Sequence, residues 1–177
     1  MIRRLAVLVL LLSALAFSQD ASKSQGYVTS QFGPEFELIN EYPMLTGDLD
    51  GDGAEDAVFV ATNKENPLLA EADFHYKVVD PYDEFFGWGD PKVTSGFNAH
   101  DPDKVKYILI VHDWKATTPK AKFVVLNLPF EKLTIGRIPL KKKVVMALKA
   151  EDMTGTTSAI YWDGKKKYKW NSMTGFD

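Results

Sequence analysis

The stretch TGDLDGDGAEDAVFV, residues 46–60, joins an acidic, glycine-containing loop to a run of apolar and β-branched residues. Counted from Asp48 as position 1, aspartates stand at positions 1, 3, 5 and 9, and a glycine stands at position 6. Tight loops that wrap oxygen ligands around a hard cation use this alternation, and glycine lets the backbone turn without a Cβ clash. Four carboxylates this close repel one another without a counter-ion, so the spacing predicts a divalent-cation site. The candidate ligands are the side chains of Asp48, Asp50, Asp52 and Asp56 and the backbone carbonyl of Ala54.

Calcium is the expected ion, because a flexible loop of carboxylates and carbonyls suits a large, irregular oxygen shell better than the strict octahedron of magnesium. An Asp- and Gly-rich surface turn without metal is the alternative, since both residues favour turns for local reasons. Five matching positions favour the ion. The expected dissociation constant is about 10⁻⁴–10⁻³ M, the range of extracellular calcium modules.

The residues after the loop predict a strand. An EF-hand requires a bidentate glutamate at position 12, where this chain has Phe59, and the exit DAVFVAT is β-branched and apolar. The loop resembles the FG-GAP/VCBS-type repeat, whose calcium loop D-x-D-x-D-G-x-x-D leads into a strand. The matching residues are Asp48, Asp50, Asp52, Gly53 and Asp56. The resemblance implies a calcium loop on a β unit, and in that family such loops decorate propeller blades. The motif occurs once, so a closed propeller of four or more blades is not expected.

The N-terminus predicts export. MIRRLAVLVLLLSALAFSQD has two arginines, an apolar run over 5–17 and small residues before a polar start. We expect a signal peptide over 1–18, with cleavage after Ala16 as the other candidate; the apolar run is shorter than the roughly 20 residues of a membrane span. A flexible tether over 19–33, rich in Ser, Gln and Gly, and a single β-rich domain over 34–177 follow. The predicted location is secreted or periplasmic.

Composition narrows the possible partners. The net charge is −3, or −5 after removal of the two signal-peptide arginines, which argues against nucleic acid. The chain has no cysteine, so its stability must come from a core or from a bound ion. No later segment has the length and apolarity of a membrane span, so no membrane insertion is expected after cleavage. The remaining candidate partners are a protein or a glycan.

Apolar runs of strand length predict a mainly β chain: a single antiparallel domain built as an open sheet, a sandwich or a partial, propeller-blade-like unit. One or two short helices are expected, one of them near 65–72, within an otherwise irregular region over 63–104. Asp163-Gly164 predicts a two-residue hairpin turn that pairs Trp162 with Lys165 and turns Tyr161 and Tyr168 inward. The expected strands lie within 36–39, 56–62, 105–114, 121–130, 133–140, 142–152 and 157–170. The segment 133–140 contains Gly136 and Pro139 and suits a sheet edge.

No nucleophile or base is framed by a recognisable catalytic motif, so we expect a structural or interaction module without catalysis. The alternative is a small secreted hydrolase or ligand-binding enzyme. Its base would be His100, beside Asp101 and Asp103, or His112, beside Asp113. That alternative requires the imidazole to lie near both a carboxylate and a hydroxyl at the wall of one pocket.

Overall fold

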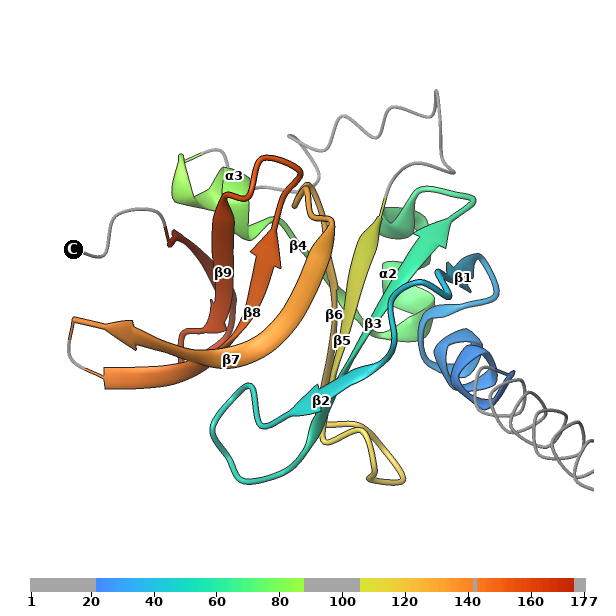
Figure 1. Cartoon of the computed structure of the whole chain (residues 1–177). Helices are drawn as coiled ribbons and strands as arrows, with labels where there is room; N and C mark the ends of the chain where they lie inside the picture. Colours follow the sequence, from blue (N-terminus) through green and yellow to red (C-terminus); the bar gives the residue numbers. More distant parts are fainter. Residues whose placement is uncertain (1–21, 88–105, 142, 174–177) are drawn as a thin grey trace, which may run out of the picture.

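The computed structural model describes residues 22–87, 106–141 and 143–173 and shows two β-sheets packed face to face, with helices on the outer face of the first sheet (Figure 1). The predicted mainly β fold is confirmed. The first sheet contains β1 (Phe36–Leu38), β2 (Leu45–Gly47), β3 (Asp56–Asn63), β4 (Lys77–Val79), β5 (Tyr107–His112) and β6 (Ala121–Val125). The second contains β7 (Lys132–Leu140), β8 (Lys143–Glu151), β9 (Thr157–Trp162) and β10 (Tyr168–Ser172).

The first sheet has the order β1-β3-β5-β6-β4, with β2 also paired to β3, and the second has the order β10-β9-β8-β7. Every described pair is antiparallel, as predicted, except β4 with β6, which is parallel. The segment with Gly136 and Pro139 forms β7, and β7 lies at the edge of its sheet, as its sequence favoured.

The central strands of the first sheet are buried on both faces. In β3, Val58 and Val60 pack toward the second sheet, whereas Ala57, Phe59 and Ala61 pack toward the helices. Successive side chains in a strand point to opposite faces, so a strand covered on both sides needs apolar residues at every position. This explains the unbroken apolar run after the acidic loop.

The predicted tether is wrong where the structure describes it, because residues 22–32 form a helix. Val28 and Phe32 lie four residues apart on one face of that helix and are fully buried, and Phe32 contacts the rings of Phe36 and Tyr76. These two apolar residues dock the helix in spite of its polar composition. The predicted signal peptide, 1–18, lies outside the described residues.

Two short helices lie in the region expected to be irregular. Helix α2 (Pro67–Phe74) begins two residues later than predicted; the Asn66 side chain caps its first turn, and His75 ends it in a left-handed conformation. Helix α3 (Pro81–Phe85) packs against β10 and was not predicted.

The C-terminal hairpin has a longer loop than predicted. Tyr168, not Lys165, pairs with Trp162, because the Asp163 carboxylate accepts hydrogen bonds from the N–H groups of the next three lysines that follow Gly164. The shift of three residues turns Tyr168 onto the same face as Trp162, into the core between the sheets. Tyr168 is therefore buried as predicted, whereas the prediction is wrong for Tyr161, which packs on the other face of the sheet.

Candidate metal centre

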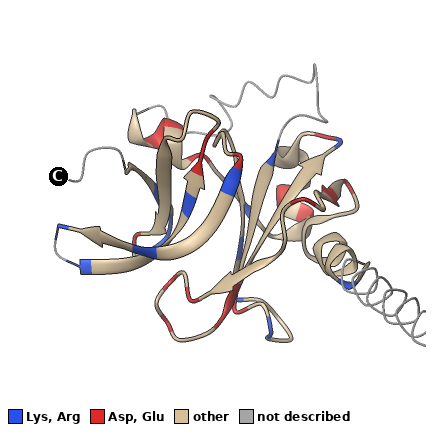
Figure 2. Cartoon of the chain, in the orientation of Figure 1, with Lys and Arg blue, Asp and Glu red and all other residues tan. Residues whose placement is uncertain are grey.

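The acidic loop connects β2 to β3 at one end of the first sheet. Figure 2 shows its acidic residues beside a basic segment of the β5–β6 turn, which the hairpin of β5 and β6 brings to the same end of the sheet. The loop thus meets residues that are more than 50 positions away in the sequence, such as Asp113 and Lys120.

The structure brings three of the five predicted ligands together. One carboxylate oxygen from each of Asp48, Asp50 and Asp56 lies within 4.8 Å of the others. Three carboxylates at such a separation fit the oxygen shell of a divalent cation, in which ligand oxygens converge on one point. They are also the residues at positions 1, 3 and 9 of the predicted loop.

Asp52, the fourth predicted carboxylate ligand, is not part of this group. The Asp52 carboxylate forms an ion pair with Lys120 and accepts a hydrogen bond of 2.9 Å from the N–H of Ala54. The bond from Lys120 is the main reason that the pKa of Asp52 is lowered. Ala54 contacts Asp52 through its N–H, whereas its predicted ligand atom is the carbonyl oxygen.

Asp48 organises the backbone of the loop. Its Oδ1 accepts hydrogen bonds from the N–H groups of Gly51, at 2.8 Å, and Asp52, at 3.1 Å, and its Oδ2 accepts one from Gly53 at 3.0 Å. Gly51 and Gly53 have φ angles of 79° and 91°, in the region that favours glycine. The glycines of the motif thus allow the chain to curl around one aspartate.

Asp56 anchors the loop to the body of the protein. Its side chain is fully buried; Oδ2 accepts a hydrogen bond of 2.7 Å from the N–H of Leu49, and Oδ1 accepts one of 3.0 Å from the N–H of Asp113. Burial raises the pKa of Asp56, and the two backbone hydrogen bonds oppose that rise. The same carboxylate therefore joins the acidic loop to the β5–β6 turn.

Lys120 is part of the site although sequence analysis did not single it out. Its Nζ lies 2.7 Å from Oδ2 of Asp50 and also contacts the Asp52 carboxylate, and these bonds raise the pKa of Lys120. The ammonium partly neutralises the loop. A metal ion and this ammonium would compete for the Asp50 carboxylate, because each is stabilised by the same negative charge.

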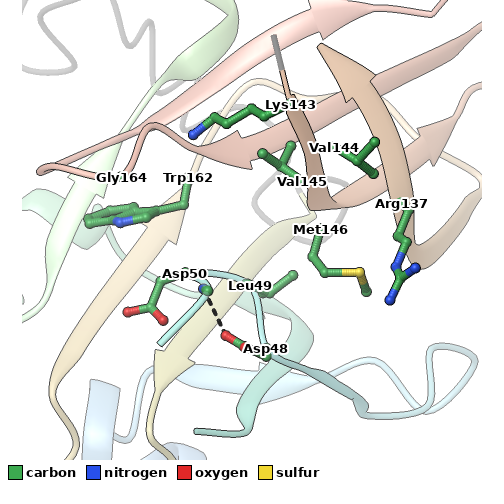
Figure 3. Close-up of a pocket in the computed structure, with 11 residues that line it drawn as sticks. Asp48, Leu49, Asp50, Arg137, Lys143, Val144, Val145, Met146, Trp162 and Gly164 are labelled. Carbon is green, nitrogen blue, oxygen red and sulfur yellow. Dashed lines mark hydrogen bonds between the residues drawn. The ribbon is translucent and has the colours of Figure 1, made fainter. Parts of the chain in front are cut away.

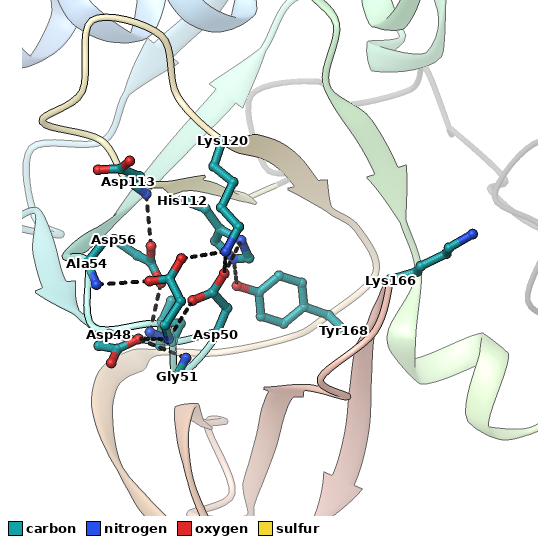
Figure 4. Close-up of polar contacts among 12 residues, drawn as sticks. Asp48, Asp50, Gly51, Ala54, Asp56, His112, Asp113, Lys120, Lys166 and Tyr168 are labelled. Carbon is teal, nitrogen blue, oxygen red and sulfur yellow. Dashed lines mark hydrogen bonds and ion pairs between the residues drawn. The ribbon is translucent and has the colours of Figure 1, made fainter.

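His112 connects Asp50 to the second sheet (Figure 4). Its Nδ1 lies 3.4 Å from Oδ2 of Asp50, and its Nε2 lies 2.5 Å from the hydroxyl of Tyr168. His112 and Tyr168 are each only 1% exposed. Burial lowers the pKa of His112 and raises that of Tyr168 well above its usual range, so both side chains are held in the neutral form.

The catalytic alternative does not gain a usable site from His112. The imidazole does lie near a carboxylate and a hydroxyl, as that alternative required, but both His112 and Tyr168 are buried. The cavity beside the loop is lined by Asp50 and not by His112 or Tyr168. A substrate has no access to the imidazole–phenol pair in this arrangement. His100 lies outside the described residues.

Comparisons with models of protein families, with curated proteins and with solved structures gave no match. The resemblance to the FG-GAP/VCBS-type repeat therefore rests on the residues of the loop. Within the described ranges, no helix combines the length and apolarity needed to cross a membrane.

Proposed function

We propose that this chain is an exported calcium-binding β domain in which Ca²⁺ staples the loop from Asp48 to Asp56, and that it acts as a structural or interaction module without catalysis. The observation that carries the proposal is the convergence of the Asp48, Asp50 and Asp56 carboxylates within 4.8 Å. The spacing of the motif and its resemblance to a known calcium loop support it. The basic and apolar N-terminus supports export.

An ion bound here would act on more than the loop. Asp56 reaches the β5–β6 turn through Asp113, and Asp50 reaches β10 through His112 and Tyr168. A cation held by these carboxylates would therefore tie the start of β3 to the neighbouring hairpin and to the second sheet. In a chain without disulfides, such a link is a direct source of stability.

This proposal is tested by thermal unfolding of the purified protein in about 10 mM CaCl₂ and in EGTA. That calcium concentration is about 10–100 times the expected dissociation constant. Binding to the folded state alone stabilises by about 1.4–2.7 kcal/mol at that excess. For a domain of this size, the melting temperature should rise by roughly 3–10 °C.

Asp50→Ala should abolish the calcium-dependent shift, because it removes a ligand that faces the other two carboxylates. Asp73→Ala is the matched control: Asp73 is an exposed aspartate on α2, outside the loop, and its variant should keep the full shift. An identical melting temperature of the unmodified protein in calcium and in EGTA would overturn the metal assignment. A shift that persists in Asp50→Ala would place the ion elsewhere.

A further inference from the structure

The inner face of the second sheet continues past the first sheet on the side of the acidic loop (Figure 1). Val144, Met146 and Leu148 alternate along β8 and so share that face. Leu148 is fully buried between the sheets, whereas Val144, four residues away, is 64% exposed. Among the described residues, nothing covers this end of the face in the way that the first sheet covers Leu148.

The uncovered end of the sheet and the acidic loop enclose a cavity of about 590 Å³, which lies in the range of small-ligand sites. Figure 3 shows the loop on one side of this space and the side chains of β7, β8 and β9 on the other. The indole of Trp162 is only partly buried and provides an aromatic surface beside the loop. The residues that line the cavity include Asp48, Asp50, Arg137, Lys143, Met146 and Trp162.

Two cationic side chains that line this cavity have no polar partner among the described residues. Arg137 and Lys143 are exposed, and neither forms an ion pair or a hydrogen bond with any residue that the structure describes. Lys120, in contrast, is already paired with Asp50. A calcium ion on the loop would offset the charges of Asp48 and Asp50, the two acidic residues that line the cavity, and Arg137 and Lys143 would then leave the lining with a net positive charge. Such a cavity complements an anion, and the guanidinium fork of Arg137 matches a carboxylate.

The loop leaves room for a ligand on the ion itself. Calcium takes 6–8 oxygen ligands, and the motif supplies five ligand residues. The glutamate that completes an EF-hand is replaced by Phe59, whose side chain is buried on the opposite face of β3 against Tyr27. The structure brings the carboxylates of Asp48, Asp50 and Asp56 together. Any coordination position that the loop does not fill would be taken by water or by a ligand oxygen.

We infer that this cavity binds a sugar acid, with its carboxylate between the loop calcium and Arg137 and the C–H face of its ring on Trp162. The inference rests on the proposed calcium site. A cavity with one aromatic wall in Trp162 and an apolar neighbour in Met146 suits a pyranose ring that carries a carboxylate. An acidic peptide would satisfy the charges but would use the aromatic wall less fully, because its carboxylate side chains have no comparable apolar face.

Isothermal titration calorimetry with galacturonate and digalacturonate tests the inference, with the same calcium concentration in cell and syringe. Binding should occur in CaCl₂ and be lost in EGTA. Galactose, which lacks the carboxylate, and tri-glutamate, which lacks the ring, should bind at least tenfold more weakly. Arg137→Gln should weaken digalacturonate binding by about tenfold or more, the usual effect of losing a charge-assisted hydrogen bond.

Lys132→Gln is the matched control, because Lys132 is an exposed cation on the same strand but outside the cavity, and its variant should bind like the unmodified protein. Arg137→Gln should keep the calcium-dependent rise in melting temperature, since Arg137 touches no loop carboxylate in the described structure.

The outcomes separate this inference from the calcium proposal. A calcium-dependent melting temperature without galacturonate binding would overturn the inference and leave the calcium site standing. Loss of both would overturn both. Equal binding in EGTA would refute the role of calcium, and equal binding of galactose would refute recognition of the acid. Binding of tri-glutamate in place of the sugar acid would assign the cavity to an acidic peptide.

Discussion

Replacing Asp56 with alanine tests whether the acidic loop is anchored independently of any ion. The buried Asp56 carboxylate accepts hydrogen bonds from the N–H groups of Leu49, in the loop, and Asp113, in the β5–β6 turn. Alanine has no acceptor, so both N–H groups would lose their partner. The loop should then detach from the turn even in the absence of calcium.

The size of the effect follows from these two bonds. A buried donor left unsatisfied costs about 1–3 kcal/mol, and the partly buried N–H of Asp113 costs less than the buried N–H of Leu49, so the two together cost at most about 6 kcal/mol. Removing a carboxylate whose pKa is raised by burial offsets part of that loss, and we expect a net loss of about 2–4 kcal/mol in the free energy of unfolding. Domains are typically stable by about 5–15 kcal/mol, so Asp56→Ala should still fold at low temperature.

Urea unfolding in EGTA at neutral pH, followed by tryptophan fluorescence, measures this loss. Asp48→Ala is the matched control, because the Asp48 carboxylate accepts three N–H groups within the exposed loop, where water can replace it. Its loss should be below about 1 kcal/mol. Both variants should lose the calcium response. A loss for Asp56→Ala no larger than that for Asp48→Ala would refute the reasoning.

The pH dependence of Asp56 has a definite sign. Because its folded pKa is raised above the ordinary 3.8, the folded state favours the protonated carboxyl. Its contribution to stability is complete below pH 3.8 and falls as the pH rises through the folded pKa. As the pH rises through this folded pKa, the difference in the free energy of unfolding between the unmodified protein and Asp56→Asn should therefore become smaller. Calcium, which binds the ionised form, should counteract the decline.

Two further predictions concern the basic side chains of His112 and Lys122. Burial lowers the pKa of His112, so stability should fall as the pH drops below 6.5, where the unfolded chain takes up the proton more readily. Thermal unfolding between about pH 5 and 7 should show this dependence of stability on pH, and His112→Gln should flatten it. His75→Gln should retain it, because His75 is exposed. Lys122 donates to the carbonyls of Gln31 and Phe74, near the ends of two helices, so Lys122→Met should lose about 1–3 kcal/mol in urea unfolding. Unchanged stability would show that water satisfies these carbonyls.

Local patterns predicted the strands well because the central strands are buried on both faces. The unbroken apolar runs of β3, β5 and β6 leave little choice other than a covered sheet. The errors arose where few residues determine the outcome. Val28 and Phe32 dock a helix that is otherwise polar, and Asp163 lengthens a hairpin turn by accepting three N–H groups. In each case one or two contacts outweighed the composition of the segment.

The candidate site could be predicted only as far as it is local. The spacing of Asp48, Asp50 and Asp56 is a property of nine consecutive residues, and the structure brings these three together. Lys120 lies 70 positions from Asp50, and only the pairing of β5 with β6 brings it to the loop. His112 was noticed for the aspartate next to it in the sequence, Asp113, whereas its carboxylate contact is to Asp50. Sequence neighbours are poor guides to partners at strand ends, where turns reorient the chain.

Hydrogen bonds within the acidic loop already order its backbone, so calcium would bind a loop that has its final shape. The Asp48 carboxylate accepts hydrogen bonds from the glycine N–H groups of the loop, and the Asp56 carboxylate accepts one from the first part of the loop. Lys120 forms an ion pair with Asp50. Calcium binding would then exchange an ammonium for a metal ion and would need little ordering of the chain. Competition with Lys120 would lower the apparent calcium affinity, in keeping with the weak binding expected of an extracellular module. Asp50 also contacts His112. If calcium binding changes the free energy of that buried contact, then by linkage the contact changes the free energy of calcium binding by the same amount.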